Sequence, residues 1–518
     1  MSIRPGPLAG EIDAFAESRH QFETVAGWLD SADAGGLEHA ELERRLQVAG
    51  RELLRRLLQD HLDLRAHREP RVEVRDCDAV AHRAVESGHR RRLTSVFGEV
   101  VVDRLAYRRH GHHNLHPADA VLNLPVERHS HGVRRLAAIE AARGSFDATV
   151  AALERATGQR VGKRQSEQLT TRAAVDFETF YATRQPPVGD SSDLLVLSCD
   201  GKGVVMRPDA LRPATARAAA TSTTKLATRL SKGEKRNRKR LAEVGAVYDA
   251  TPVPRVPADV LSATTAEPAH DTARDQTSRA RSSRARTGPV ATGKWLTASL
   301  ARDAADVVAD LFDEAERRDP DHARTMIALV DGNNHQIDRI TTEADARGIE
   351  INIVIDFVHV LEYLWKAAWC FHDEADPNAE TWVQDKAREV LAGHATRTAA
   401  AIRRKATYHR LSGPARKAAD TTANYLTRKA RYLDYPTALA RGWPIATGVI
   451  EGACRHLVKD RMDITGARWG LPGAEAILKL RALTANHDFD DYWRFHLAQE
   501  QRRVHEPRYA QNRLPQAA

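Results

Sequence analysis

The chain has 518 residues, 42% of them hydrophobic, which is enough for several folded cores and excludes a protein disordered throughout. Lysine and arginine outnumber aspartate and glutamate by 78 to 70, and the resulting charge of +8 favours a polyanionic partner over an acidic small molecule. The four cysteines form no CxxC pair and no run of about eighteen uncharged apolar residues exists, so we expect a cytoplasmic protein without disulfides or a membrane anchor.

The first 90 residues are predicted to form a helical N-terminal region. Leucines recur near helical spacing among charged residues between positions 10 and 68. Such a segment could pair with a second helix, but the heptad pattern is short, which favours an amphipathic helix packed inside its own domain.

A β-hairpin is predicted next, at residues 95–107, with its bend near Gly98. Four histidines follow within seven positions, at His110, His112, His113 and His116. They could hold a metal ion, but no second group of ligands completes a tetrahedral set in the sequence, so we interpret them as a solvated loop.

A helix-turn-helix is predicted within residues 91–185, the expected DNA-binding region. Ser145 can cap the first helix, Thr157-Gly158 can end it, and Gly162 can open the second. The second helix of this motif enters the major groove, and its first turns carry the side chains that we expect to contact bases: Lys163, Arg164, Gln165 and Gln168. An ordinary helical hairpin with a solvated basic face is the alternative.

Basic residues are dense between positions 207 and 240, where eleven lysines and arginines stand against two acidic residues. This density suits phosphate contacts, although a solvated flexible loop would look the same. The expected DNA contacts are Lys235, Arg236, Arg238, Lys239 and Arg240. A second arginine-rich stretch at 270–287 is predicted to be disordered without DNA.

Short apolar runs ending in Asp-Gly place one carboxylate each, Asp200 and Asp331, at the tip of two buried strands. Glu451 opens a helix far downstream. Strands at 194–198, 203–206, 244–248, 326–330 and 351–355, with helices at 302–318 and 335–347, predict an α/β core of ribonuclease H-like layout. Its first part spans 190–359, a helical insertion 360–440 and its last part, with Glu451, 441–495; residues 496–518 are predicted to be a flexible tail.

Three carboxylates brought together repel one another unless cations lie between them. Mg²⁺ prefers hard oxygen ligands, and two ions about 4 Å apart are typical of phosphoryl transfer. We therefore expect a site for two Mg²⁺ or Mn²⁺ ions that acts on DNA or RNA strands by phosphoryl transfer.

Several motifs together resemble the DDE transposases of bacterial insertion sequences, and the ISKra-type group in particular. They are residues 199–204 (CDGKGV), 233–248, Asp331-Gly332 and residues 448–456 (GVIEGACRH). Asp356-Phe357-Val358-His359 is similar to the Asp-x-x-His signature of Mutator-like relatives. The resemblance implies DNA transposition and recombination, with Asp200, Asp331 and Glu451 as catalytic, metal-binding triad. It also implies terminal inverted repeats and target DNA as partners, and a nucleoid-associated homo-oligomer, a dimer on DNA.

The possible accessory residues are Asp356, His359, Arg455, His456, Arg468 and Trp469. His359 could be a buried structural histidine or could orient DNA or the attacking water. Trp469 could stack on a splayed base or belong to the core. Two other functions remain open: a nuclease of the same fold that cuts without joining, and a domesticated DNA-binding protein without catalysis.

Overall fold

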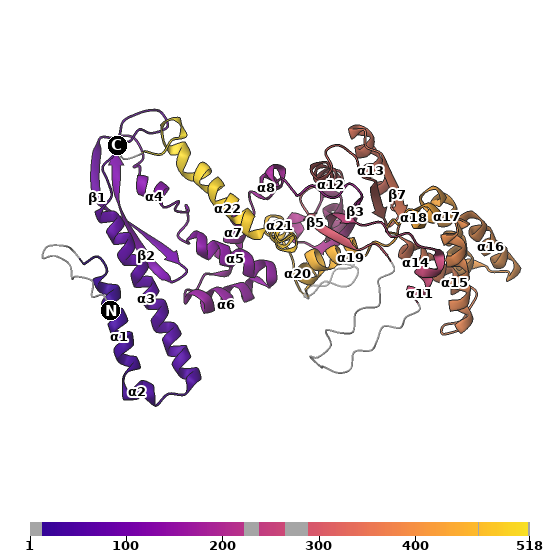
Figure 1. Ribbon diagram of the computed structural model, residues 1–518, viewed down its shortest axis with the longest axis horizontal. Helices are drawn as coiled ribbons and strands as arrows, with labels where there is room; N and C mark the ends of the chain where they lie inside the picture. The colour runs from indigo at the N-terminus through magenta and orange to yellow at the C-terminus, as the bar shows by residue number, and fades with distance from the viewer. Residues whose placement is uncertain (1–12, 222–237, 265–287, 465, 516–518) are drawn as a thin grey trace. The chain divides into compact units, whose positions relative to one another are not determined.

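The computed structural model describes residues 13–221, 238–264, 288–464 and 466–515 (Figure 1). The chain divides into two compact units. The first, here called the terminal unit, combines Met1–Thr183 with His487–Ala518, and the second, the central unit, is Arg184–Asn486. Each unit is described separately below.

The described part of the segment 10–68, which was predicted to be helical, consists of helices separated by short breaks. They are α1 (Ala16–Leu29), α2 (Ala32–Gly35) and α3 (His39–His67). The helical conformation is interrupted at Ser31, whose hydroxyl accepts the Ala34 amide and caps α2, and again at Gly36 after α2. The helices α1 and α3 pack against each other, and the buried Asp60 carboxylate accepts the Ser18 amide at 2.9 Å.

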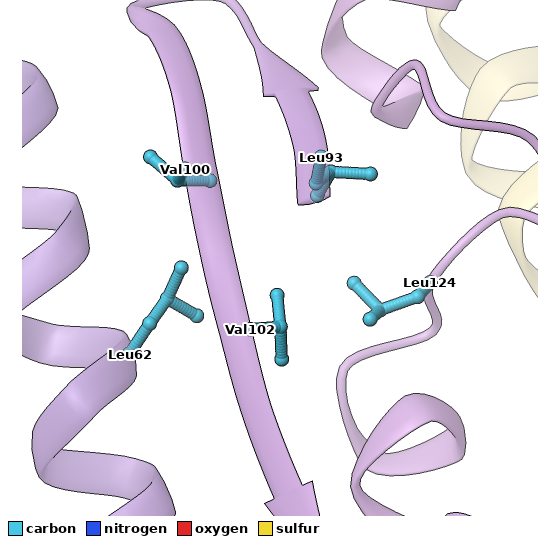
Figure 2. Packing of buried hydrophobic residues seen from close by; sticks show 5 residues of the cluster. All are labelled: Leu62, Leu93, Val100, Val102 and Leu124. Carbon is cyan, nitrogen blue, oxygen red and sulfur yellow. The ribbon is translucent and has the colours of Figure 1, made fainter. Parts of the chain in front are cut away.

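The predicted hairpin is present and longer than expected. Strands β1 (Ala84–Ser95) and β2 (Gly98–Arg108) pair antiparallel, and the tight turn puts Gly98 at φ +136°, a conformation that side chains rarely adopt. Figure 2 shows Leu62 of α3, Leu93 of β1 and Leu124 of a later loop around Val100 and Val102 of β2. Helix α3 is therefore packed within its own unit through Leu62.

A group of helices follows the hairpin. The predicted helix-turn-helix corresponds to α6 and α7: the Ser145 hydroxyl caps α6 by accepting the Ala148 amide at 3.1 Å, and Gly158 ends it at φ +69°. A small apolar cluster with Leu153 and Leu169 joins these helices to α5. The helices are α4 (Pro117–Val121), α5 (His131–Arg143), α6 (Phe146–Thr157), α7 (Lys163–Ala173) and α8 (Phe177–Thr183).

The C-terminal segment is folded, so the prediction of a flexible tail from residue 496 is wrong for its described part. Tyr509 is buried, and Glu500 forms an ion pair at 2.7 Å with Arg134, a side chain only 1% exposed. Charged residues resemble a tail in isolation, because their partners lie more than 300 positions away. The segment contains α22 (Phe489–Glu500), the π-helical turn η4 (Gln501–His505) and two 3₁₀ turns, η5 (Glu506–Arg508) and η6 (Ala510–Asn512).

The central unit contains a five-stranded mixed sheet in the order β5-β4-β3-β6-β7. The strands are β3 (Leu194–Val205), β4 (Lys239–Ala250), β5 (Ala291–Ser299), β6 (Met326–Val330) and β7 (Ile351–Ile355). Strand β4 runs antiparallel to its neighbours β3 and β5, whereas β3, β6 and β7 are parallel. The molecule is therefore a mixed α/β protein with an additional helical region.

Strands β6 and β7 have the predicted bounds, but β3 differs from the prediction. The two strands expected on either side of Asp200 are one continuous strand, paired with β4 along its length. Gly201 and Gly203 look like a turn in the sequence, yet they are needed because the side chains of Leu241 and Lys239 lie across them, within 2.9 Å of where a Cβ would be. Strand β5 was not predicted, since it has few apolar residues.

Helices pack on both faces of the sheet. Leu311 of α12 (Ala304–Arg318) lies against Gly245 of β4, while Cys454 contacts Asp200, whose partner in β4 is Val244. Because successive residues of a strand point to opposite faces, α12 and the helical segment at Cys454 cover opposite faces. That segment comprises α19 (Gly448–Ala453), the π-helical turn η3 (Cys454–Lys459) and α20 (Asp460–Met462).

The predicted insertion at 360–440 is helical, and its helices gather in one part of the central unit (Figure 1). They are α14 (Phe357–Ala368), α15 (Pro377–Leu391), α16 (Ala395–Tyr408), α17 (Gly413–Arg428), the 3₁₀ turn η2 (Ala430–Tyr432) and α18 (Tyr435–Ala440). The other helices in the described part of this unit are η1 (Pro208–Ala210), α9 (Pro213–Thr221), α11 (Pro257–Thr264), α13 (Asn334–Arg347) and α21 (Leu471–Ala485). No helix within the described residues is long and apolar enough to cross a membrane.

Candidate active site

Three aspartates stand in one row across the parallel part of the sheet. Strands β3 and β6 pair Leu197 with Ala328, and strands β6 and β7 pair Val330 with Ile355. Continuing both registers by a few residues aligns Asp200, Asp331 and Asp356. Their side chains therefore share one face, at the carboxyl ends of β6 and β7, where open α/β sheets bind their ligands.

The Asp331-Gly332 dipeptide turns the chain sharply at the end of β6. The Asp331 carboxylate accepts the Asn333 amide at 2.7 Å, and Asn333 in turn caps α13. Gly332 has φ +92°, and a Cβ there would lie 2.9 Å from the hydroxyl oxygen of Tyr425. That hydroxyl donates to the Asp331 carbonyl at 3.2 Å, so a helix of the insertion, α17, supports the turn. Burial raises the pKa of Tyr425, which keeps the hydroxyl a donor.

Asp200 contacts the helical segment that carries Glu451. The thiol of Cys454, three positions after Glu451, donates to the Asp200 carboxylate at 3.4 Å. Burial, together with the charge of Asp200, raises the pKa of the Cys454 thiol, so the thiol stays neutral and donates its proton. This contact fixes α19 and its glutamate over the strand that bears Asp200.

Glu451 and Asp356 are joined through Thr447. The Thr447 hydroxyl donates a short hydrogen bond to Asp356 and lies 3.4 Å from the carboxylate of Glu451. Asp356 is buried, which raises the pKa of its carboxyl, and it also accepts the Val358 amide at 2.9 Å as the N-cap of α14. Asp356 therefore has a structural task as well as a place in the row.

His359 is not the buried histidine that we considered. Its side chain is 31% exposed, lies 3.5 Å from Glu362 and meets the rings of Tyr363 and Tyr425 edge-on. Because Tyr425 also supports the Asp331 turn, His359 stands at the border of the candidate site.

The donor set of the site suits a hard divalent cation. Its exposed and half-buried ligands, Asp200, Asp331 and Glu451, are all carboxylates, and the neighbouring thiol is neutral. In the described part of the chain, the carboxylate oxygens of these three residues do not all lie within 4.8 Å of one another. A different group of three residues, in the terminal unit, does meet this spacing and is described below. The three carboxylates are therefore brought to one region of the sheet without forming a compact ligand cluster.

Of the four side chains predicted to contact bases, two are exposed on α7 and two form contacts within the protein. Arg164 and Gln168 are exposed on α7. Gln165 accepts the Gly162 amide at 3.1 Å and caps the helix, and Lys163 pairs with Asp147 at 2.8 Å in an exposed ion pair. Arg164 and Gln168 are therefore the better placed of the four for contacts with bases.

The structure describes the two ends of the basic segment, residues 207–221 and 238–240. Lys235 and Arg236, like the stretch 270–287, lie outside the described residues. Lys239 is exposed at the start of β4 and Arg238 is half-buried. Arg240 does not fit the expected phosphate contact, because its guanidinium donates to the carbonyls of Leu300, Ala301 and Ala210.

The accessory residues beyond Glu451 separate into surface and core. Trp469 is buried, its indole N–H donates to the Met462 carbonyl at 3.1 Å, and Arg461 lies over its ring at 4.7 Å. Stacking of Trp469 on a base is therefore wrong, and the core alternative holds. Arg468 is exposed, and Arg455 and His456 both lie near Asp460 on the surface.

A second polar centre lies in the terminal unit, where the sequence indicated only a solvated loop. Asp76, His82 and His112 have ligand atoms within 4.8 Å of one another and could hold a metal ion. The missing ligands lay about 30 residues upstream of the histidine-rich segment. The other three histidines of that segment, His110, His113 and His116, are not in the group.

The geometry defines a mixed α/β protein with a row of carboxylates at the ends of its parallel strands. No family model matches the chain, and no curated protein sequence matches it.

Proposed function

We propose that the chain is a DDE transposase of a bacterial insertion sequence, which cleaves DNA at the ends of its element and joins the freed 3′-hydroxyl to target DNA. The observation that carries the proposal is the arrangement of Asp200 and Asp331 in register on adjacent parallel strands, with the helix of Glu451 held against Asp200 by Cys454.

The strand order supports a ribonuclease H-like core. A meander of three strands, β3, β4 and β5, is followed by two parallel strands that add to the other side of β3. The first aspartate lies on the first strand, the second follows the fourth strand, and the glutamate lies on a helix after the fifth. The helical insertion before the glutamate agrees with the resemblance to ISKra-type and Mutator-like enzymes.

The triad would hold Mg²⁺ or Mn²⁺. Two such ions supply Lewis acidity to a phosphodiester and lower the pKa of a bound water or hydroxyl. The chain's own residues position the ligands: Tyr425 holds the backbone of Asp331, Cys454 orients Asp200, and Thr447 links Glu451 to Asp356.

The proposed DNA contacts follow from exposure. Arg164 and Gln168 of α7 are suited to read the terminal inverted repeat, whereas Lys239 and Arg238 are suited to phosphates. A nucleoid-associated homo-oligomer, dimeric on DNA, would hold the two ends of the element.

The test needs DNA from both flanks of the gene, since the terminal repeats are there. The purified full chain is mixed with a linear fragment carrying one flank and a supercoiled target plasmid, with Mg²⁺ or Mn²⁺. We expect a nick at a fixed position and a joined product in the plasmid, both absent for Asp331→Asn. Asp338→Asn is the matched control, because Asp338 is an exposed aspartate on the neighbouring helix α13.

The two other functions give different products. Cleavage without joining would identify a nuclease, and specific binding without either product would identify a DNA-binding protein that has lost catalysis. Wild-type rates in Asp331→Asn would contradict the proposed site.

A further inference from the structure

We propose that Asp76, His82 and His112 form a zinc-class metal site in the terminal unit, separate from the carboxylate row and independent of the proposed function. Asp76 and His82 are buried and His112 is exposed, so the group is closed on one side and open to solvent on the other. Two imidazoles and one carboxylate are a ligand set that suits Zn²⁺, with a fourth position open to water.

Two turns far apart in sequence bring the three residues together. Asp76 lies in a turn in which its own backbone pairs with Val80. His112 lies in a loop closed by two backbone hydrogen bonds between Tyr107 and Leu115, at 2.8 and 3.0 Å. The loop is thus short and tethered, which gives His112 a defined position although it is exposed.

The Asp76 carboxylate has different tasks for its two oxygens. Oδ1 accepts the backbone amides of Asp78 and Val80 at 3.0 and 2.9 Å, which fixes the carboxylate plane. Oδ2 faces both imidazoles, at 3.1 Å from Nε2 of His82 and 3.0 Å from Nδ1 of His112. A tetrahedral zinc with bonds of about 2.0–2.1 Å separates its ligand atoms by roughly 3.3 Å, so these spacings are close to those of a ligand set.

The tautomer of His82 is set by its second nitrogen. Its Nδ1 lies 3.2 Å from the Tyr107 carbonyl, which can only accept, so an ion that takes Nε2 leaves the hydrogen on Nδ1, where it has an acceptor. In a neutral imidazole, Nε2 then aims its lone pair at the space beside Asp76. Metal-binding histidines are oriented in this way, by donating their other N–H to a carbonyl or carboxylate.

The site would join the turn at residues 76–80 to the loop at 108–114. A bound ion would replace the direct contacts between the Asp76 carboxylate and the two imidazoles with three ligand bonds, and so would stabilise both turns. We therefore assign the ion a structural task within the terminal unit.

Zinc binding is measured on the untagged full chain after chelator treatment, in an Asp331→Asn background that removes the competing carboxylate site. We expect one zinc per chain by elemental analysis. His112→Ala and Asp76→Asn should weaken binding by at least about 100-fold in competition with a chromophoric chelator, because even outer-shell partners contribute about 10–100-fold. His113→Ala is the matched control on the same exposed loop and should bind as the parent does.

Spectroscopy identifies the ligand directly. His112→Cys in a Cys77→Ser background is loaded with Co²⁺, and a thiolate-to-cobalt charge-transfer band is expected that the Cys77→Ser parent lacks. No zinc in the parent, unchanged affinity in both His112→Ala and Asp76→Asn, or the absence of that band would each overturn the proposal. None of these outcomes depends on DNA cleavage, so failure here is distinct from failure of the proposed transposase activity.

Discussion

The two polar centres of this molecule contrast in how they are built. In the central unit, Asp200 and Asp331 come from strands whose register aligns them, and each follows a buried apolar run. In the terminal unit, Asp76, His82 and His112 come from turns and depend on backbone hydrogen bonds between remote segments. The first centre offers only oxygen and is open in spacing, whereas the second offers nitrogen and oxygen within a small volume. The difference favours hard cations at the first and zinc-class ions at the second.

Neutralising Asp200 is the strongest test of whether the two polar centres are independent. Asp200→Asn keeps the shape of the side chain but removes a charge, and loss of several kcal/mol of transition-state stabilisation lowers the rate by about 1,000-fold or more. Strand cleavage under single-turnover conditions should fall by that factor while zinc stoichiometry in the terminal unit stays unchanged. Simultaneous loss of both would mean that the centres are not independent.

The terminal unit should be far more sensitive to loss of a buried charge than to loss of an exposed one. Arg134 is 1% exposed and pairs with Glu127 and Glu500, so Arg134→Met removes the buried partner of both carboxylates and leaves them only the more exposed Arg172 and Arg503. We expect the free energy of unfolding to fall by about 3–5 kcal/mol. It is measured by urea titration, with hydrogen exchange reporting on the unfolding of each unit.

The matched control for this change is Arg135→Met on the same helix. Its exposed pair with Asp490 should contribute no more than about 1 kcal/mol. Equal effects of the two changes would contradict the importance of burial.

The sequence predicted those parts of the central unit that depend on local pattern. Strands β6 and β7 are short apolar runs, each followed directly by an aspartate, and their bounds agree with the prediction. The Asp-Gly turn at Asp331 was readable for the same reason. Strand β3 was divided in two, because Gly201 and Gly203 are explained only by the side chains of β4 that cross them.

The terminal unit was less readable because its key contacts are remote. His112 was visible, but its neighbours Asp76 and His82 are about 30 residues upstream and follow no motif. Glu500 looked like part of a tail, since its partner Arg134 lies on another helix. Trp469 of the central unit was ambiguous for a similar reason, and only its burial decides that it belongs to the core.

The DNA contacts of the two units should differ in kind. Replacing Arg164 and Gln168 with Ala should reduce the preference for the terminal repeat over random DNA, by about 1–3 kcal/mol for each base that is no longer recognised. Lys239→Ala should instead weaken both DNAs alike and reduce the salt slope by about 1. Fluorescence anisotropy at several salt concentrations separates the two effects.

Arg155→Ala is the control for α7, because Arg155 is an exposed arginine on α6 and its replacement removes the same charge. If the variant of Arg164 and Gln168 kept the preference for the terminal repeat over random DNA, α6 and α7 would be an ordinary helical hairpin with no part in repeat recognition.

The smallest effect expected is a gain in stability from Asp356→Asn. The contribution of Asp356 to stability should depend on pH in the opposite direction to that of Glu500 in the terminal unit. Burial raises the pKa of Asp356, so its folded pKa lies above its unfolded pKa and its contribution to stability is lost as the pH rises through that interval. Asn removes this loss and can still accept one hydrogen bond. At pH 7 the variant should be more stable than the wild type, by less than the roughly 3–5 kcal/mol lost in Arg134→Met.

The pKa of Glu500 is shifted by folding in the opposite direction to that of Asp356. Burial alone would raise its pKa, but hydrogen bonds from Arg503 and Arg134 outweigh it and lower the pKa to about 2. Its contribution is therefore present above the ordinary carboxyl pKa of about 4 and is lost as the pH falls toward 2. Hydrogen exchange between pH 7 and pH 3 should show protection in the terminal unit falling, while the advantage of Asp356→Asn over the wild type in the central unit shrinks. An Asp356→Asn variant that is less stable at pH 7 would show that the Thr447 hydroxyl and the Val358 amide stabilise the ionised carboxylate by more than its burial costs.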